Sequence, residues 1–583
     1  MTANTCFSSV LVVSAFAIFG HTSVLAQGAE DRIDAAKARL ERFREFAEQL
    51  PPNKQRLLSS GALNLLQTAK EFGELERGLR GLQQQGSALP QLAAPREGIA
   101  AQSAIMLSAL QPIPVSRSTD DLVYSQIAGF TQSETSTAWC GNNIVVGFND
   151  SGSFFESLVS GTGGLSFNGY ARSINQGGTF TDLRFLNPGP NGFDFLGGDP
   201  VVACTSSNVF YYASLFFTGT PAAPRSAISV SKSINGGLAF SSPIVVVSKD
   251  AFTHFLDKEW MTVDPTNPSR VFVTYTDFDL SLTSCGTDAQ GLPIPRVAIE
   301  FSRSANGGAT WSAPIVIDQV CSPFTVPGSF VQGSQIAVGP GGGVYVAWER
   351  YAADYVTRDI RVRKSNDHGA SFAPRTIATT VTCVGGCFSV RGGFRDFIDL
   401  NSLIVDRSTT PTRATVYIAW QDGRKVRTVD LGSDSGFYSY SDMFVVASSD
   451  GGATWSAPIQ INDNVEPLAS GKGTDQYQGG LAVDRNGHLA ACFYDRRGDS
   501  LNWFIDRFCA RSQNGGATWT NVRVENTRFA PFHATDMLIN PFYMGDYDVL
   551  ASDFNLINAG FVGAYQVLTP RGNPNVFATK LQP

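Results

Sequence analysis

The sequence predicts an all-β protein, a β-propeller of seven blades preceded by a helical hairpin. Three observations predict this fold. Glycine is abundant, with 57 residues, and aromatic residues make up 11% of the chain against only 16% charged residues, a balance that favours short strands joined by tight turns. Short apolar strands recur at regular intervals from about residue 120 onward, and one turn motif recurs six times. A chain of 583 residues built from such units is typical of a repeat architecture.

Residues 1–26 have the pattern of a signal peptide. An apolar stretch runs over residues 7–20, and Val24 and Ala26 are the small residues that a signal peptidase reads. The sequence therefore predicts a secreted or periplasmic protein with no membrane span after removal of the signal. Because no Lys or Arg precedes the apolar stretch, an uncleaved membrane anchor is the alternative.

The next segment, residues 27–86, is predicted to form a helical hairpin. Apolar residues recur at spacings of three and four in residues 33–50 and again in residues 58–82, and two prolines separate the stripes. The stripes could pack on the propeller, bind a partner protein or form a dimer. Residues 87–118, rich in Ala, Pro and Gln, are predicted to be a linker, and residues 119–583 the propeller.

Eight cysteines remain after the signal, and an even number in an exported chain predicts disulfides. Eight cysteines allow many pairings, so only their proximity along the chain favours one set. The favoured pairs are Cys140 with Cys204, Cys285 with Cys321, Cys383 with Cys387, and Cys492 with Cys509.

The recurring turn has the pattern Ser-x-Asp/Asn-x-Gly-x-x-aromatic, with Thr or Ser before the aromatic residue in five copies. Its six copies are Ser173–Phe180, Ser233–Phe240, Ser304–Trp311, Ser365–Phe372, Ser448–Trp455 and Ser512–Trp519. We expect the Asp or Asn side chain to bond backbone amides two residues on, the glycine to adopt positive φ and the aromatic ring to fill space beside the next strand. The motif resembles the Asp-box of sialidases and related BNR-repeat propellers. This resemblance covers most of residues 120–583 and implies a structural role for the boxes.

A second apolar strand precedes each box, and a seventh copy of it has no box. These strands are Ile144 to Phe148, Val209 to Ala213, Val271 to Tyr275, Val344 to Trp348, Val416 to Trp420, Leu489 to Tyr494 and Phe561 to Gln566. Seven copies favour seven blades; six blades, as in sialidases, is the alternative. The last blade lacks a fourth strand, and we expect Leu122 to Ile127 to supply it and close the ring.

In a four-stranded meander, the starts of the innermost strands and the ends of the second strands share one face. Charged residues gather at these positions, which predicts a polar ligand site on that face. At the starts are Asp199, Asp257, Lys258, Glu259, Asp399, Asp475, Asp546, Tyr547 and Asp548; at the ends are Asp150, Asp277, Glu349, Arg350, Asp422, Arg424, Asp495 and Arg496. The boxes lie on the opposite face, which is predicted to be inert.

The resemblance to sialidases implies roles for some of these residues. Arg350, Arg424 and Arg496 would grip a substrate carboxylate, Tyr547 would be the nucleophile, and a carboxylic acid would protonate the leaving oxygen. Asp257 and Glu349 are the candidate acids. The remaining predicted substrate-binding residues are Lys258, Asp422, Asp495 and Asp546.

The sequence departs from the sialidase pattern because no Phe/Tyr-Arg-Ile-Pro element precedes the first box. Three alternatives therefore stand beside a secreted exo-glycosidase. The charged ring could consist of salt bridges between blades, the chain could be a polysaccharide lyase, or it could be a non-catalytic propeller that binds a glycan or a protein outside the cytoplasm.

Partners and cofactors follow from charge and residue type. A net charge of −7 without a basic stripe excludes nucleic acid as a favoured partner, which leaves a glycan or glycoconjugate. No metal motif is present, and the histidines are scattered, so we expect no cofactor. Calcium near Asp546, Asp548 and Asp553 is the alternative, because carboxylate oxygens suit that ion.

Overall fold

The protein is described here by a computed structural model. It describes residues 34, 37–38, 40–50, 55, 58–59, 62–63, 66, 69–70, 73, 112–117, 131–160, 163–323, 328–387, 389–391, 398–433, 435–524, 528–530, 536, 539, 544–556, 559–568 and 574–582. The predicted signal peptide and most of the predicted linker lie outside these residues.

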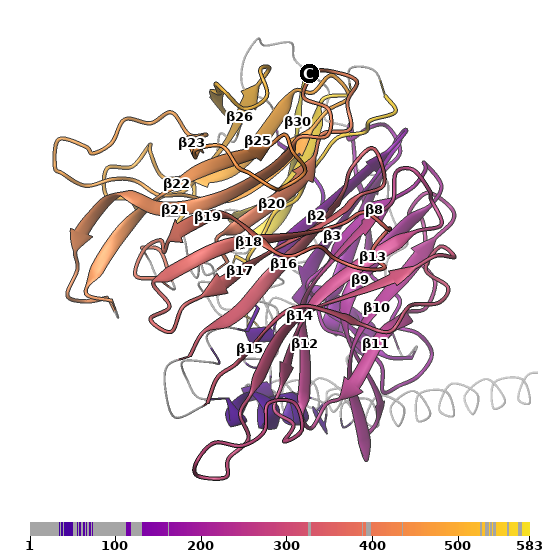
Figure 1. Cartoon of the computed structure of the whole chain (residues 1–583). Coiled ribbons are helices and arrows are strands. Elements are labelled where there is room, and N and C mark those ends of the chain that lie inside the picture. Colours follow the sequence, from indigo (N-terminus) through magenta and orange to yellow (C-terminus); the bar gives the residue numbers. More distant parts are fainter. Residues whose placement is uncertain are drawn as a thin grey trace, which may run out of the picture.

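The chain folds as a β-propeller of seven sheets, each built on an antiparallel meander, which confirms the predicted fold and excludes six blades (Figure 1). We number the blades in chain order and name their strands from the axis outward. Blade 1 is β2 (Gln132–Cys140), β3 (Asn143–Asp150), β5 (Asn168–Ser173) and β6 (Thr181–Phe185). Blade 2 is β8 (Val201–Cys204), β9 (Phe210–Thr220), β10 (Ala223–Ser233) and β11 (Ile244–Asp250), extended by β7 (Phe195–Leu196) and β4 (Leu165–Ser166). Blade 3 is β12 (His254–Val263), β13 (Val271–Asp279), β14 (Arg296–Ser304) and β15 (Ile315–Cys321).

The remaining blades repeat the same meander. Blade 4 is β16 (Phe330–Val338), β17 (Val344–Tyr351), β18 (Thr357–Ser365) and β19 (Thr376–Thr382). Blade 5 is β20 (Leu400–Val405), β21 (Val416–Val429), β22 (Phe437–Ser448) and β23 (Ile459–Gln460). Blade 6 is β24 (Gln476–Val483), β25 (Leu489–Asp495), β26 (Asp506–Ser512) and β27 (Thr520–Arg523). Blade 7 is β28 (Leu550–Ala551), β29 (Phe561–Leu568), β30 (Pro574–Leu581) and β1 (Ile113–Pro114).

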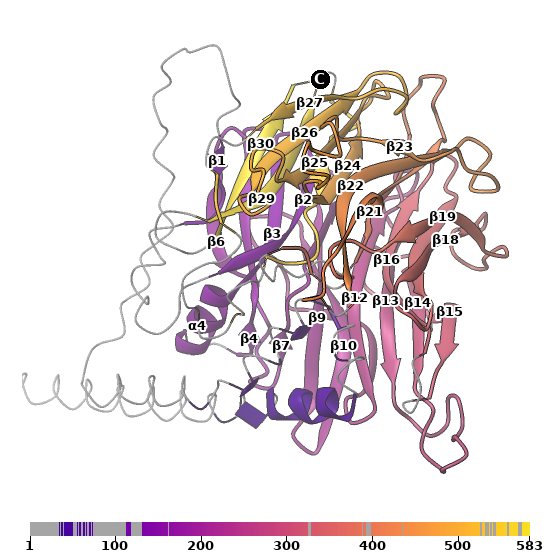
Figure 2. The same cartoon turned by 90° about the vertical axis from the view of Figure 1, so that its left-hand side faces the viewer.

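The strand that completes blade 7 comes from a different segment than expected. Strand β1 pairs with β30, with Ile113 opposite Ala578 and Pro114 opposite Phe577 (Figure 2). The expected strand at residues 122–127 lies outside the described residues, and its place in the sheet is taken by β1. The propeller therefore includes residues that the sequence assigned to the linker. This strand is only two residues long and contains a proline, so the sequence shows no strand pattern there.

Helices are few among the described residues. Helix α4 (Ser151–Val159) follows β3 in blade 1, and the Asp150 carboxylate caps it by accepting from the amides of Gly152 and Ser153 at 3.0 and 3.1 Å. Residues 40–49 of the predicted hairpin are helical and lie against the propeller (Figure 2). Within the described part of the chain, no helix has the length and apolar character needed to cross a membrane.

The Asp-boxes are built as tight polar turns. In the third box the Ser304 hydroxyl accepts from the amide of Gly308 at 2.9 Å and donates to Asn306, whose Oδ1 accepts from the amide of Thr310 at 2.9 Å. The Asp or Asn oxygen thus binds the amide four residues on, and not two as expected, because the Ser hydroxyl takes the intervening donors. The glycine at position five is at positive φ, as predicted.

All four predicted disulfide pairs are present. They are Cys140–Cys204, Cys285–Cys321, Cys383–Cys387 and Cys492–Cys509. Such bonds are typical of proteins outside the reducing cytoplasm.

A β-bulge near the start of the inner strands shapes the channel along the propeller axis. In β2, β12, β16 and β24 the register with the second strand shifts by one residue, and the first bulged residue has φ between 48 and 69°. These residues are Glu134, Lys258, Gly333 and Gln478. Asp199 (φ 55°) and Gly545 (φ 81°) adopt the same left-handed conformation just before the inner strands of blades 2 and 7. Only glycine adopts this region without an energetic cost. The backbone is therefore strained at the four of these residues that are not glycine.

We predict that ring closure depends on the buried Val115 next to β1. Its amide donates to Val576 O at 2.9 Å, and its side chain is 2% exposed in the cluster formed with Trp139 and Ala578. Val115→Ala should lower the free energy of unfolding by about 2 kcal/mol, because it leaves a cavity where the two chain ends meet. Urea unfolding measures this change. Ile174→Ala is the control, since Ile174 is 63% exposed, and a change as large as that of Val115→Ala would contradict the prediction.

Candidate functional site

Seven side chains meet where the inner strands of blades 1, 2, 3 and 7 begin. We call this group the axial cluster. It consists of Glu134, Asp199, Asp257, Lys258, Glu259, Asp546 and Tyr547, and each is at most 5% exposed. The cluster holds five carboxyl groups and a single ammonium group. The structure thus brings together six residues that the sequence placed on this face: Asp199, Asp257, Lys258, Glu259, Asp546 and Tyr547.

Lys258 is the cation at the centre of the cluster. Its Nζ lies 3.8 Å from Glu134 Oε1 and 3.6 Å from Asp546 Oδ2, and 3.9 Å from the centre of the Tyr547 ring. Burial lowers the pKa of Lys258, but the charges of Asp546 and Glu134 outweigh it and raise the pKa above its ordinary value. Lys258 therefore carries its charge and neutralises part of the cluster.

The carboxyl groups outnumber the donors available to them. Neither oxygen of Asp199 or Glu259 accepts a hydrogen bond from another described residue, and both side chains are fully enclosed. Burial, reinforced by the charge of Asp199, raises the pKa of Glu134 and of Glu259 well above the usual range. The cluster therefore holds protons near neutral pH, as a crowded set of carboxyl groups in a dry site must.

Asp257 is the carboxyl group with one oxygen held and one oxygen free. Its Oδ2 accepts from the Ser59 amide at 2.8 Å and from Gln332 Nε2 at 2.9 Å, whereas Oδ1 accepts from no described residue. Burial, with the charge of Asp199, raises the pKa of Asp257 to about 7. A carboxylic acid with this pKa can donate a proton at neutral pH.

The N-terminal helical segment covers the axial cluster. Ser59 is fully buried against Asp257, and its hydroxyl also accepts from the amide of Ala62 at 3.0 Å. Beside this contact, the ring of Phe43 lies 4.9 Å from that of Phe255, and the Phe46 ring lies 5.7 Å from it. The apolar stripe of the first helix therefore packs on the propeller itself.

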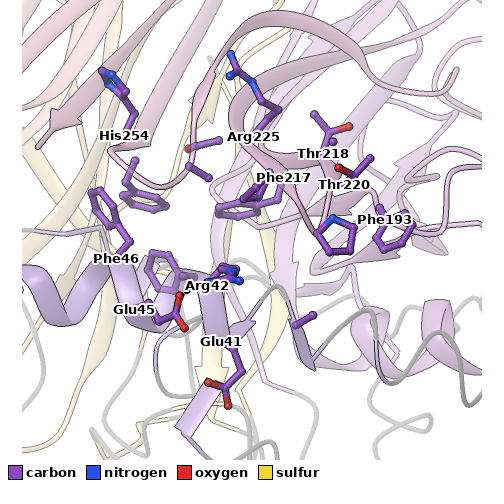
Figure 3. A pocket seen from close by; sticks show the side chains of 18 residues that line it. Glu41, Arg42, Glu45, Phe46, Phe193, Phe217, Thr218, Thr220, Arg225 and His254 are labelled. Atoms are coloured by element: carbon purple, nitrogen blue, oxygen red, sulfur yellow. Dashed lines mark hydrogen bonds and ion pairs between the residues drawn. The ribbon is translucent and has the colours of Figure 1, made fainter. Parts of the chain in front are cut away.

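A pocket of about 340 Å³ lies between this helix and blades 2 and 3. Figure 3 shows Arg42 and Phe46 of the helix facing Phe217, Arg225 and His254 of the propeller across it. Arg42 is already paired with Glu45 at 2.6 Å, and Arg225 with Ser248. The pocket is an apolar gap in the helix packing, rimmed by satisfied charges.

Tyr547 is buried in the cluster, but no group activates it as a nucleophile. Its hydroxyl donates to Pro200 O at 2.8 Å, and Trp260 packs edge-on at 5.5 Å. Burial, with the charges of Glu134 and Asp199, raises the pKa of Tyr547 well above its ordinary value. A phenol nucleophile needs the opposite shift or an adjacent base.

The three predicted substrate-gripping arginines do not converge. Arg496 lies 3.6 Å from Asp475 and donates to two backbone carbonyls. Arg424 donates to Asp422 at 2.5 Å, and Arg350 lies 3.8 Å from Asp318. They sit on or just after the second strands of blades 5, 6 and 4, one strand further from the axis than the cluster, and each is paired within the propeller.

The other predicted acids also serve the blades. Glu349 accepts from the hydroxyl of Tyr351 and the amide of Leu400, and burial with the charge of Asp399 raises its pKa to about 8. Asp422 accepts from Arg424 and the indole of Trp420.

Asp495 is held by Arg497 at 2.7 Å, and burial raises its pKa to about 6. Like Glu349 and Asp422, it makes no hydrogen bond or ion pair with the residues of the axial cluster that the structure describes. The predicted salt bridges between blades do not describe these three acids: Asp422 and Asp495 pair with arginines of their own blades, and Glu349 accepts from a hydroxyl and an amide.

The residues considered for calcium lie apart. Asp546 faces Lys258, Asp548 accepts from the Thr135 hydroxyl at 2.6 Å, and Asp553 accepts from the amide of Gly141 at the other end of the inner strands. Another described group, His254, Asp277 and Asp279, places three ligand-type atoms within 4.8 Å.

Two cations already fill that second group. Lys249 lies 2.8 Å from Asp277, and Arg296 lies 3.0 Å from Asp277 and 3.6 Å from Asp279. A metal ion would have to displace them, so the group is a salt-bridge network.

Sequence reasoning missed Glu134 and Ser59. Glu134 lies in a polar stretch, QSETST, that does not have the apolar alternation of a strand. The spacing to the second strand does not identify it either, because Glu134 lies nine residues before β3 whereas Lys258 lies thirteen residues before β13. For Ser59 the sequence carries no signal, since its contact with Asp257 spans 198 residues.

No protein-family model matches the sequence, and no curated protein matches it. Solved structures resemble it in fold. An ulvan lyase, a polysaccharide lyase, has a TM-score of 0.46 at 10% identity over 78% of this chain and 94% of that chain. An α-L-arabinanase of Penicillium chrysogenum with arabinobiose has 0.40 at 10% identity over 66% and 94%. The NanB sialidase of Streptococcus pneumoniae has 0.38 at 8% identity over 75% and 83%. At these levels the likeness concerns the propeller fold alone.

We predict that Asp257→Asn changes how stability depends on pH. The pKa of about 7 lies above the ordinary 3.8, so across that window the folded protein holds a proton that the unfolded chain has released. The free energy of unfolding therefore falls as the pH rises through the window. Asn does not titrate, so the variant should lose less stability between about pH 5 and about pH 8 than the parent, as measured by urea unfolding. Equal losses in both proteins would refute the assignment.

Proposed function

We propose that the protein is a glycan-directed hydrolase that uses the axial cluster as its acid–base site. The observation that carries this proposal is Asp257, a buried carboxylic acid with a pKa of about 7 and an oxygen that accepts from no described residue. Glycoside hydrolysis requires such a protonated carboxyl group beside the leaving oxygen. The resemblance of the six boxes to those of sialidases supports the substrate class.

A second carboxyl group is needed as base or nucleophile. Asp546 is the candidate, because the Lys258 ammonium group lies 3.6 Å from its Oδ2 and pairs with it. Asp257 and Asp546 thus have different surroundings, one enclosed beside Asp199 and the other beside an ammonium group. In glycosidases, two carboxyl groups in different surroundings take the roles of acid and base.

The sialidase mechanism itself is not part of this proposal. The three arginines are paired in their blades, and the Tyr547 hydroxyl donates to a backbone carbonyl. We therefore assign no carboxylate clamp and no tyrosine nucleophile. A glycan without a sialic acid fits the remaining groups better.

A non-catalytic propeller that binds a glycan or a protein is the second candidate. It is favoured by the enclosure of the cluster under the N-terminal segment, with every member at most 5% exposed. A hydrolase with this structure requires the segment to move before a sugar can reach Asp257. The two candidates therefore differ in whether opening the segment produces turnover.

Phe43→Ala is predicted to increase hydrolysis. The change removes the ring that packs on Phe255 and Phe217 and costs the packing of the helix about 3–5 kcal/mol. The kcat/KM on a panel of fluorogenic neutral, uronic-acid and sialic-acid glycosides should rise severalfold, while faster hydrogen exchange in residues 40–50 reports the opening. Glu48→Ala, on the exposed side of the same helix, is the control and should match the parent. An opened segment without turnover on any substrate favours the binding propeller.

Asp257→Asn is predicted to lower kcat by about 10²- to 10⁴-fold on the substrate that the panel identifies, because the general acid is lost. The measurement is made in the full chain and in the Phe43→Ala background. Asp182→Asn is a matched control, since burial raises the pKa of Asp182 in blade 1 to about 7 as well and it lies outside the cluster. A similar loss of kcat in both variants would remove Asp257 from the mechanism.

A further inference from the structure

The axial channel has a second, larger cavity at the opposite mouth. It measures about 680 Å³ and is lined by the last residues of the inner strands of all seven blades. This volume lies within the range of small-ligand sites. Because the inner strands of blades 1, 2, 3 and 7 begin at the axial cluster and end at this cavity, the two are at opposite ends of the channel.

A repeated turn determines which residues line this opposite mouth of the channel. The inner strands of four blades are followed by an Asp whose Oδ1 accepts from the amide two residues on, at 2.7 to 2.8 Å. These residues are Asp264, Asp406, Asp484 and Asp553. The residue after each Asp is delivered to the cavity wall. In order, these wall residues are Pro265, Arg407, Arg485 and Phe554.

The acids that line the cavity have no free oxygen to offer a cation. Asp264 accepts from Thr266 at 2.6 and 2.8 Å and from Arg270 at 3.2 Å. Asp553 accepts from the amides of Gly141 and Asn555 at 2.5 and 2.8 Å. Both carboxylates are therefore satisfied by groups other than the cavity's arginines.

Arg407 is the cation that these bonds leave unpaired. Its guanidinium makes no hydrogen bond and no ion pair with any residue that the structure describes, and it lies 4.3 Å from the centre of the Phe554 ring. By contrast, Arg413 donates to two backbone carbonyls at 2.8 and 3.1 Å, and Arg485 donates to Asn555 O. Burial lowers the pKa of Arg407 to about 10 although Asp553 and Asp264 act in the opposite direction, so its charge is incompletely compensated.

We propose that Arg407 anchors a binding site for a small oxyanion, a carboxylate or sulfate group, at the mouth of the channel opposite the axial cluster. A guanidinium binds such groups with two parallel hydrogen bonds, and the Phe554 ring holds the guanidinium plane from one side. Thr205, Thr262 and Thr409 also line this cavity, and a threonine hydroxyl can serve as a neutral partner for a hydroxylated ligand. The face that carries the Asp-boxes is then a ligand-binding face. This inference is independent of the function proposed for the axial cluster.

The test is isothermal titration of the full chain with sodium sulfate, sodium acetate and sodium glucuronate, with glucose as the neutral comparison. At least one anion should bind and glucose should not. Arg407→Gln should weaken anion binding by about 10- to 100-fold, the effect of losing charge-assisted hydrogen bonds. Arg303→Gln is the control for net charge, because Arg303 donates to His368 O outside the cavity, and it should bind like the parent.

The anions distinguish the ligand classes. Binding of sulfate alone assigns a sulfated ligand, and binding of acetate or glucuronate assigns a carboxylated one. Absence of binding by all three anions, or an affinity unchanged in Arg407→Gln, would overturn the proposal. Arg407→Lys covers the case in which the Gln variant does not fold: it keeps the charge but not the planar fork, and it should bind more weakly than the parent. Binding at parental strength in Arg407→Lys would also overturn it.

Discussion

The left-handed bulge at the start of the inner strands is the constraint on which the rest of the site depends. An extended strand alternates its side chains between the two faces of the blade, so an unbulged inner strand would not direct charged groups at the axis. The bulge at Glu134 and Lys258, and the matching conformation at Asp199, turn these side chains toward one point. The backbone strain of non-glycine residues at positive φ is tolerated because the surrounding blades fix it.

This geometry explains how much of the site could be predicted from the sequence. The meander rule placed Asp257, Lys258, Asp546 and Tyr547 on the correct face, and the structure brings them together. The same rule could not give the distance from the axis. Arg350, Arg424 and Arg496 share the face but belong to second strands or the turns after them, about 4.8 Å further out, where neighbouring acids and carbonyls already surround them.

The fold itself was readable because its signals are local. Each Asp-box specifies its own turn through hydrogen bonds within five residues, as between Ser304, Asn306 and Gly308. Each disulfide joins two cysteines with no other cysteine between them in the sequence. The closing strand and the covering segment depend on contacts across the whole chain. Ile113 meets Ala578 and Ser59 meets Asp257, and no short-range pattern encodes either pairing. Propensity and periodicity therefore predicted the blades, but they did not predict the strand that closes the ring or the segment that covers the axial cluster.

The way in which the ring closes leaves the covering segment open to removal by proteolysis. Strand β1 is the outermost strand of blade 7 and is held there by β30, so the described part of residues 34–73 lies outside the closed ring of sheets. The covering segment is joined to the propeller by one stretch of peptide and by its own packing. A single proteolytic cut between the covering segment and β1 would leave every blade complete. The covering segment would then be held by its packing alone and could dissociate. Such a cut would uncover Asp257 irreversibly, at a rate set by the local concentration of protease and not by the stability of the fold.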